Sequence, residues 1–416
     1  MKRYESYKPS GISWIGQIPS HWEVAQLRKF LSLVSIKGHG NKQLLSVTRE
    51  QGVIVRDMES KDANHNYIPD DLSNYKLVKK GQFAINKMKS WQGSYAVSNY
   101  EGIVSPAYYV CDLNFDNKDF FSWAIRSKAY IPFFTQMSKG IRVDQWDLST
   151  NALKDIPFFV PTPEEQKKIV EFLSTKTSLI DAQQRERERE LRLLDELKQA
   201  EIANVVTRGL NPDVPMKDSG IPWIGQIPAH WEVKPLSGLI ARKQTQANPA
   251  DKKIGLENIE SWSGNYVETN TVFDGTGPHF DIGDILYGKL RPYLAKTWVA
   301  TFSGQAVGDF YVFRNKNISD SHYITYLLLN PKYVFLLDSF TYGAKMPRVS
   351  WDDMGKVYVT VPPIEEQKAI VAYIQQKTQS IDEMIASLRA EIDFLTEYKQ
   401  RLIADVVTGQ VNVQNL

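Results

Sequence analysis

One uninterrupted stretch constrains this chain most: no proline or glycine occurs between Pro163 and Gly209. Thr162 can cap a first helical turn, and Glu165, three positions on, can reach back as in a capping box. Pro163 suits the first helical position, and Gly209 is a typical stop. The sequence therefore predicts a single helix, roughly 65 Å long at 1.5 Å per residue. Globular helices of that length usually lie against a partner helix.

A second copy of this stretch, residues 362–409, supplies the partner at an offset of 201 residues. Both copies place apolar residues at alternating steps of three and four, the heptad pattern of a coiled coil. In the first copy the pattern weakens at Gln184 and Arg187. Two unrelated helices buried in separate cores are the alternative, but the matching length and register favour mutual pairing.

A second repeat precedes each module. Residues 11–24 recur at 220–233 with only Ser13 and Ser20 replaced, by Pro222 and Ala229. We call these segments the lead motifs. Their His21 and His230 stand beside tryptophans, which favours a packed or hydrogen-bonded role over a catalytic one. The chain thus reads as two tandem copies of lead motif, module and long helix, with predicted segments 1–160, 161–210, 211–361 and 362–416.

The two modules have the texture of an α+β fold. Short apolar-polar alternations punctuated by Gly and Asn predict mostly strands, with helices expected at 120–127 and 322–329. The expected architecture is two tandem mixed α/β modules joined by two long helices that pair as a coiled coil.

Composition and charge indicate which cellular compartment and which kind of partner to expect. The single cysteine, Cys111, excludes an intrachain disulfide and fits a reducing cytoplasm. We expect no signal peptide, because no apolar run follows Met1, and no membrane span, because no apolar run approaches 18 residues. The net charge is +2, but residues 1–160 alone carry 21 Lys and Arg against 15 Asp and Glu, or +6. The positive excess therefore lies outside the helices, where a phosphate-facing surface needs it.

Enzyme motifs find little support. Gly283-x4-Gly288-Lys289 imitates a phosphate-binding loop, but Leu290 follows instead of Ser or Thr. Residues 59–61, Glu-Ser-Lys, resemble a nuclease triplet without its upstream Pro-Asp. Six scattered histidines and one cysteine give no zinc spacing, so we expect no catalytic residue, metal or cofactor in this chain.

Basic and aromatic residues instead gather on loops that follow predicted strands or contain glycine. Arg and Lys can contact phosphates or guanine, and Gln can pair with adenine; ordinary exposed loop cations are the alternative. The candidate DNA-binding residues are Lys87, Lys89, Ser90, Trp91, Arg142, Gln145, Lys289, Arg291, Tyr342, Lys345 and Arg348.

These features together resemble the specificity (S) subunit of type I restriction–modification systems. The resemblance rests on the lead motifs at Gly11 and Gly220 and on Pro-x-x-Glu-Glu-Gln-Lys at Pro161 and Pro362. Residues 283–294, Gly-Asp-Ile-Leu-Tyr-Gly-Lys-Leu-Arg-Pro-Tyr-Leu, are also typical. The resemblance covers essentially the whole chain, although the first module departs from the pattern at residues 83–88.

The resemblance implies a non-catalytic subunit with two target-recognition domains, each of which reads half of a bipartite double-stranded DNA sequence. The two long helices would lie antiparallel and give the chain pseudo-two-fold symmetry. The helix pair would set the half-site spacing and dock two modification (methyltransferase) subunits, joined by restriction subunits in a prokaryotic cytoplasm. S-adenosylmethionine, ATP and Mg²⁺ would belong to those partners. A fused restriction–methylation enzyme and a coiled-coil adaptor that binds only proteins are the rival hypotheses.

Overall fold

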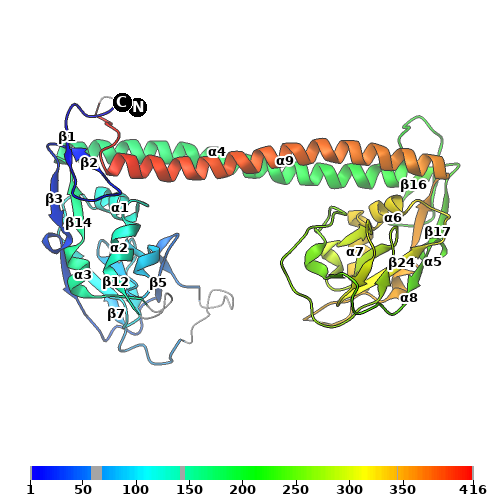
Figure 1. The fold of residues 1–416 in the computed structure, drawn as a ribbon, viewed down its shortest axis with the longest axis horizontal. Helices are drawn as coiled ribbons and strands as arrows, with labels where there is room; N and C mark the ends of the chain where they lie inside the picture. The colour runs from blue at the N-terminus through cyan, green and yellow to red at the C-terminus, as the bar shows by residue number, and fades with distance from the viewer. Residues whose placement is uncertain (1, 58–67, 141–145, 344, 415–416) are drawn as a thin grey trace. The chain divides into compact units, whose positions relative to one another are not determined.

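The computed structural model describes residues 2–57, 68–140, 146–343 and 345–414. It contains two compact units (Figure 1). Unit 1 comprises Met1–Glu186 with Glu391–Leu416, and unit 2 comprises Arg187–Ala390. Each unit takes part of each long helix. The predicted domain boundaries after residues 160, 210 and 361 follow the sequence repeat and not this division into two units. They remain predictions.

Both predicted long helices are present: α4 covers Pro163–Arg208 and α9 covers Ile364–Val407. The capping box of α4 has formed, because the Glu165 N–H donates to Thr162 Oγ1 at 3.4 Å and the Thr162 N–H donates to Glu165 Oε2 at 3.2 Å. Gly209 follows the helix with φ +76°, a conformation that glycine adopts without a steric penalty.

Within each unit the two helices run antiparallel. In unit 1, Lys399 Nζ donates to Asp181 Oδ1 at 2.5 Å, and Gln184 Nε2 donates to Thr396 Oγ1 at 2.7 Å. The partner number falls as the α4 number rises. The predicted apolar seam is turned inward in both halves, and Gln184, which weakened it in the sequence, bridges the two helices by a hydrogen bond.

The same antiparallel order holds in unit 2. Lys198 Nζ donates to Asp382 Oδ1 at 2.6 Å, and the Tyr373 hydroxyl donates to Glu201 Oε1 at 2.6 Å. The expected pairing of the two helices is therefore confirmed inside each unit.

A strand of each lead motif pairs with the strand just before the motif in a short antiparallel hairpin, and the motif contacts the start of a long helix. The hairpins are β1 (Tyr7–Pro9) with β2 (Gln17–Pro19), and β15 (Met216–Asp218) with β16 (Gln226–Pro228). Trp22 and Trp231 are fully buried behind them. The two histidines are hydrogen-bonded to helix glutamates, in line with the structural role expected from the sequence.

The core of each module is a four-stranded antiparallel sheet with the same strand order. In unit 1 the order is β4 (Leu31–Val34), β11 (Tyr109–Leu113), β8 (Phe83–Ile85) and β9 (Tyr95–Val97). In unit 2 it is β18 (Ile240–Lys243), β24 (Phe310–Asn315), β21 (Ile285–Gly288) and β22 (Thr297–Val299).

The elements around the sheets also correspond. In unit 1 they are β3 (Glu23–Gln26) paired with β14 (Pro157–Val160), η1 (Leu27–Lys29), α1 (Lys118–Arg126), α2 (Ile131–Met137) and α3 (Thr150–Asp155). In unit 2 they are β17 (Glu232–Pro235) paired with β25 (Tyr358–Val361), α5 (Leu236–Leu239), α6 (Ser321–Leu328), α7 (Pro331–Ser339) and α8 (Trp351–Met354). The helices expected at 120–127 and 322–329 are confirmed as α1 and α6.

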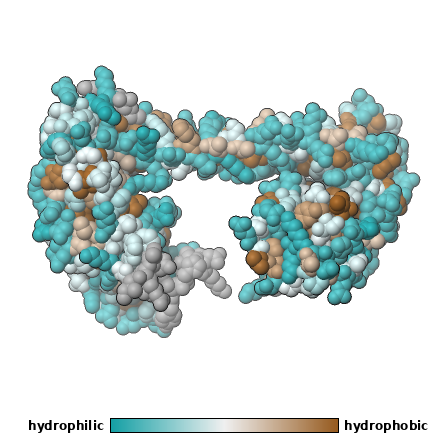
Figure 2. Space-filling model, in the orientation of Figure 1, coloured by the Kyte–Doolittle hydropathy of each residue, from teal (hydrophilic) through white to brown (hydrophobic). Residues whose placement is uncertain are grey.

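The units differ beside the main sheet. Unit 1 has the hairpin β5 (Leu45–Thr48) with β6 (Gly52–Val55) and the pair β7 (Lys76–Val78) with β10 (Gly102–Val104). Unit 2 has a three-stranded sheet of β19 (Lys253–Ile254), β23 (Gly304–Ala306) and β20 (His279–Phe280). The visible surface of both units is largely hydrophilic, with scattered hydrophobic residues (Figure 2). The expected α+β class with two long helices is confirmed, and the pseudo-two-fold relation stays a prediction.

Candidate nucleic-acid interface

Two loops that the sequence flagged separately meet in unit 2. Leu290 and Arg348 form an antiparallel bridge, and the Arg291 N–H donates to the Pro347 carbonyl at 2.7 Å. Tyr342 and Arg348 exchange backbone hydrogen bonds of 3.0 Å and close a hairpin around Gly343. The structure therefore brings Lys289, Arg291, Tyr342 and Arg348 together; exposed Lys345 lies in the same hairpin.

Asp309, at the start of β24, organises these cations. Arg348 donates to it through two nitrogens, Nε at 2.9 Å and Nη2 at 2.8 Å, and Lys289 Nζ lies 3.7 Å from Oδ1. These contacts hold the pKa of the Asp309 carboxyl below its ordinary range, the hydrogen bond from Arg348 being the largest cause. Asp309 is thus a negative centre that fixes two positive side chains.

Tyr311, two residues further along β24, lies beside two cations. Arg242 Cζ lies 5.0 Å from the centre of the tyrosine ring, and Lys289 Nζ lies 5.5 Å from it. The Tyr311 hydroxyl donates to the Val349 carbonyl at 3.1 Å, which ties the ring to the hairpin. Cations at these distances are attracted by the ring quadrupole. The sequence had given no reason to select Arg242, Asp309 or Tyr311.

The loop after β21 is held in a strained backbone conformation. Arg291 and Ala295, with φ of 50° and 46°, lie on either side of the short 3₁₀ turn η5 (Pro292–Leu294). Non-glycine residues rarely adopt the left-handed region, and such strain is concentrated at functional sites. Arg291 is exposed on this loop.

Unit 1 assembles the corresponding loops around an ion pair. Lys87 Nζ donates to Asp147 Oδ2 at 2.8 Å, and the Leu148 N–H donates to the Lys87 carbonyl at 3.1 Å. The hydrogen bond to Asp147 raises the pKa of Lys87. Trp91 and Trp146 contact each other with ring centres 5.3 Å apart.

The remaining sequence candidates of unit 1 differ in their surroundings. Lys89 is exposed next to the 3₁₀ turn η2 (Ser90–Gln92). Ser90 is fully buried, and its hydroxyl donates to the Lys87 carbonyl at 3.1 Å, so in this structure it stabilises the turn from inside. Arg142, Gln145 and the triplet at 59–61 lie outside the described residues. The hairpin strands that flank 140–146 are β12 (Ser138–Lys139) and β13 (Asp147–Leu148).

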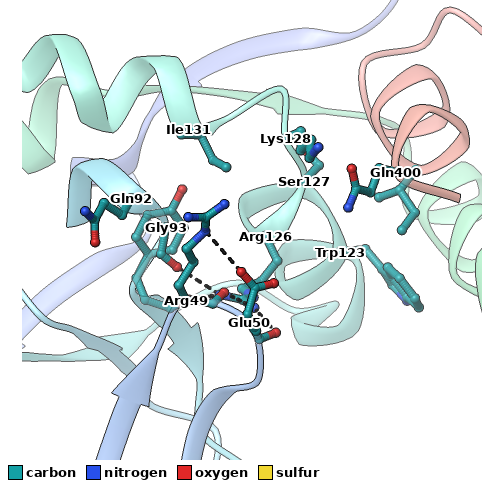
Figure 3. Close-up of a pocket in the computed structure, with 12 residues that line it drawn as sticks. Arg49, Glu50, Gln92, Gly93, Trp123, Arg126, Ser127, Lys128, Ile131 and Gln400 are labelled. Carbon is teal, nitrogen blue, oxygen red and sulfur yellow. Dashed lines mark hydrogen bonds and ion pairs between the residues drawn. The ribbon is translucent and has the colours of Figure 1, made fainter. Parts of the chain in front are cut away.

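A cavity of about 410 Å³ lies between the module and α9 in unit 1 (Figure 3). Arg126 forms one wall and donates to the carbonyls of Arg49, Glu50, Gly93 and Tyr95 at 2.8 to 3.1 Å. Four hydrogen bonds occupy most of the five donors of a guanidinium. Arg126 therefore ties the 49–50 turn to the sheet, and its burial lowers its pKa.

Comparisons with known proteins agree with this architecture. Residues 229–393 match the family model of the type I restriction modification DNA specificity domain. The chain is 24% identical to the EcoDI specificity subunit of Escherichia coli. The alignment spans 355 residues and covers 77% of this chain and 77% of the relative. The chain is 22% identical to the MjaVIII specificity subunit of Methanocaldococcus jannaschii, which covers 96% of this chain and 95% of the relative.

Two solved structures share the fold. One, from work on complex assembly and conformational transition of the type I R-M system, has a TM-score of 0.70 at 15% identity and covers 95% of this chain and 99% of its own. The HsdS subunit of Thermoanaerobacter tengcongensis has a TM-score of 0.50 at 17% identity and covers 95% and 98%.

The comparisons support the resemblance to type I restriction–modification specificity subunits that the motifs indicated. These relatives are named specificity subunits.

The described residues lack a metal site and a membrane-spanning helix. They contain no group of three or more His, Cys, Asp or Glu side chains that could hold a metal ion. In that part of the chain, no helix is long and apolar enough to cross a membrane.

Proposed function

We propose that this chain gives a cytoplasmic type I restriction–modification complex its DNA sequence specificity, with each unit reading one half of a bipartite target. One observation carries the proposal. In both units a loop after the third strand of the sheet is hydrogen-bonded to a hairpin from the end of the module, at Lys87 and Leu148 and at Lys289 and Val349. The frame is repeated, while the side chains on it differ, as two readers of different sequences require.

The side chains on these loops have suitable chemistry. Lys89, Arg291 and Lys345 are exposed, and Arg and Lys are among the side chains that contact DNA phosphates. Trp91 and Tyr342 add aromatic surface, which can contact bases or sugars. Base edges in the major groove offer distinct donor and acceptor patterns to such loops.

The long helices would separate the two readers and dock modification subunits. Each helix carries an exposed apolar pair one turn apart, Leu193 and Leu197 on α4, and Phe394 and Tyr398 on α9. The pairs are offset by 201 residues, like the helices themselves, and between 40% and 65% of each side chain is exposed. A repeated exposed apolar pair suits two copies of one protein partner.

Catalysis would reside in the partners. Modification subunits would bring S-adenosylmethionine, and restriction subunits would bring ATP and Mg²⁺. The helix length would limit the half-site separation to on the order of one to two DNA turns of about 34–36 Å.

The test is to co-express the full chain with its modification subunits and to map methylated bases by single-molecule sequencing. We expect two short specific blocks separated by a fixed gap. Methylation without regard to sequence context would contradict the proposal. Assembly with partners but no salt-sensitive binding to any DNA would favour the protein-only adaptor instead.

A further inference from the structure

The two sheets can be compared position by position, because their ladders have the same register. Leu33 lies opposite Cys111 in unit 1, and Arg242 lies opposite Phe313 in unit 2. The hairpins correspond through the bonds to Lys87 and Lys289 described above. Five positions then match: Leu33 with Arg242, Lys87 with Lys289, Ala107 with Asp309, Tyr109 with Tyr311, and Asp147 with Arg348.

In unit 2 these positions form a compact cationic cluster, the Tyr311 cluster. Arg242 and Lys289 lie 5.0 and 5.5 Å from the Tyr311 ring centre, and Arg348 is held by Asp309. Three positive side chains and one carboxylate leave a net charge of +2. The four charged residues come from three separate strands or strand ends and a hairpin, so only the fold brings them together.

In unit 1 the same positions are electrically neutral. Lys87 is paired with Asp147, which stands where unit 2 has Arg348. Ala107 stands at the position of Asp309, so the carboxylate is missing. Leu33, which is 40% exposed, stands at the position of Arg242. The tyrosine is retained as Tyr109, so the frame is the same and only the charges have changed.

We propose that the Tyr311 cluster is a DNA-phosphate site of unit 2 that has no counterpart at the equivalent place in unit 1. The inference rests on the proposed function and adds a difference between the two units. At this place unit 2 binds the DNA backbone, and unit 1 does not. Arg242, which no sequence motif marks, is the member that distinguishes the two units most simply.

A DNA phosphate fits the chemistry of the Tyr311 cluster better than the edge of a base does. Specific recognition of guanine by arginine uses two donors on one edge of the guanidinium. Asp309 already occupies the Nε and Nη2 edge of Arg348, and Nη1 lies 3.4 Å from the Met346 carbonyl. What the cluster still offers a ligand is its net positive charge. That charge attracts a phosphate regardless of the DNA sequence.

The test is the salt dependence of DNA binding by the full chain assembled with its modification subunits. Each neutralised phosphate contributes about 0.9 to the slope of log affinity against log salt. We expect Arg242→Gln to lower that slope by about 1 and to weaken binding roughly five- to tenfold near 0.1 M salt. Target and non-target DNA should lose affinity by similar factors, and the methylated sequence should stay the same.

Three matched variants sharpen the result. Leu33→Gln, at the equivalent strand position of unit 1, should leave the slope unchanged. Arg242→Lys keeps the charge and should keep the slope, which separates charge from packing. Asp309→Asn removes the single negative charge of the cluster and should steepen the slope.

The outcomes are distinguishable. If the wild-type complex binds its target but Arg242→Gln keeps the full slope, the cluster faces away from DNA and the inference is wrong, while the proposed function stands. If Arg242→Gln alters one block of the methylated sequence, the cluster reads bases and the phosphate assignment is overturned. If the wild-type complex binds no DNA, the proposed function fails as well.

Discussion

The two lead motifs are nearly identical in sequence, yet unit 1 buries its helix contact more deeply than unit 2. Glu165 accepts a hydrogen bond from Trp22 Nε1 at 3.4 Å and lies 3.0 Å from His21 Nε2. The equivalent Glu366 makes contacts of 3.0 and 2.9 Å with Trp231 and His230. The Glu165 side chain is 2% exposed, whereas that of Glu366 is 29% exposed.

The segment that follows each long helix explains the difference. Beyond α9 the chain returns over the lead motif of unit 1, where Gln414 Nε2 donates to Glu165 Oε1 at 2.6 Å and Val413 is buried. Beyond α4 the chain continues into the linker to the second module. Nearly identical motifs therefore acquire different environments from the segment that follows the helix, and substitutions at the two glutamates can measure that effect.

Glu165→Ala should have the largest effect on stability. It leaves the buried Trp22 indole, Gln414 and the helix N-terminus without their common acceptor, a change that costs on the order of 3 kcal/mol. Glu366→Ala, at the more exposed site, should cost about 1 kcal/mol. Hydrogen exchange of peptides from each lead motif reports the two local unfolding free energies separately. Equal losses would show that the tail does not strengthen the unit 1 contact.

The repeated apolar pairs on the helices give the next largest effect. Phe394→Ser should weaken binding of one modification subunit by about 2 kcal/mol, roughly 30-fold, because exposed aromatics are typical interface anchors. Leu193→Ser, at the equivalent position of α4, should cost about 1 kcal/mol at the other subunit. Native mass spectrometry of titrated complexes measures both affinities.

Leu179→Ser is the matched control for that comparison. Leu179 is also exposed on α4, but Ser380 occupies its equivalent on α9. Its substitution should leave both affinities unchanged, and a loss as large as that of Phe394→Ser would place the partner elsewhere on the helices.

Acid should weaken the contact of Glu165 in unit 1. Burial raises the pKa of Glu165, but hydrogen bonds from His21, Thr162 and Trp22 outweigh it and hold the pKa below its ordinary value of 4.5. A depressed folded-state pKa stabilises the fold above the unfolded value, and that contribution disappears as pH falls through the folded value. Neighbouring Tyr4 stays neutral, since burial and then the Glu165 carboxylate raise its pKa.

The measurement is the stability difference between the wild type and Glu165→Gln from pH 7 to pH 2. We expect a constant difference above about pH 5 and a shrinking one below 4.5. A difference that stays constant throughout would mean that Glu165 is not ionised in the folded state.

The smallest effect concerns the turn after the third sheet strand. Gly93 in unit 1, with φ +97°, and Ala295 in unit 2, with φ 46°, both end the 3₁₀ turn in the left-handed region. Gly93→Ala should cost about 1 kcal/mol, and Ala295→Gly should stabilise by about 0.5 kcal/mol. Thermal unfolding measures both. A loss of stability in Ala295→Gly would show that the alanine side chain stabilises the loop more than its backbone strains it.

The features that depend on local patterns of residues could be predicted from the sequence. The heptad seam, the capping box at Thr162 and the repeated motifs predicted both long helices and the tandem order. The loops at Lys289 and Arg348 were singled out separately from the sequence, and the fold brings them together. Their role as DNA contacts remains a prediction.

What the sequence did not reveal depends on strand register. Arg242 lies in a strand and Asp309 at the start of another, and neither has a neighbour in sequence that marks it. Their proximity to Arg348 requires the pairing of β18 with β24 and the return of the hairpin, both long-range features. Ser90 shows the reverse case, since a polar residue in a basic loop turned out to be buried in the turn.

The central claim is that each unit reads its own half of the target, and a module exchange tests it most directly. In both units a matching hydrogen bond closes the module, from Leu27 N to the Ile156 carbonyl and from Leu236 N to the Val357 carbonyl, each at 2.9 Å. Residues 27–156 can therefore be replaced by residues 236–357 at equivalent joints. Methylation mapping of this chimaera with its modification subunits should show both blocks carrying the sequence read by unit 2. A map in which the unit 1 block is unchanged would contradict the account.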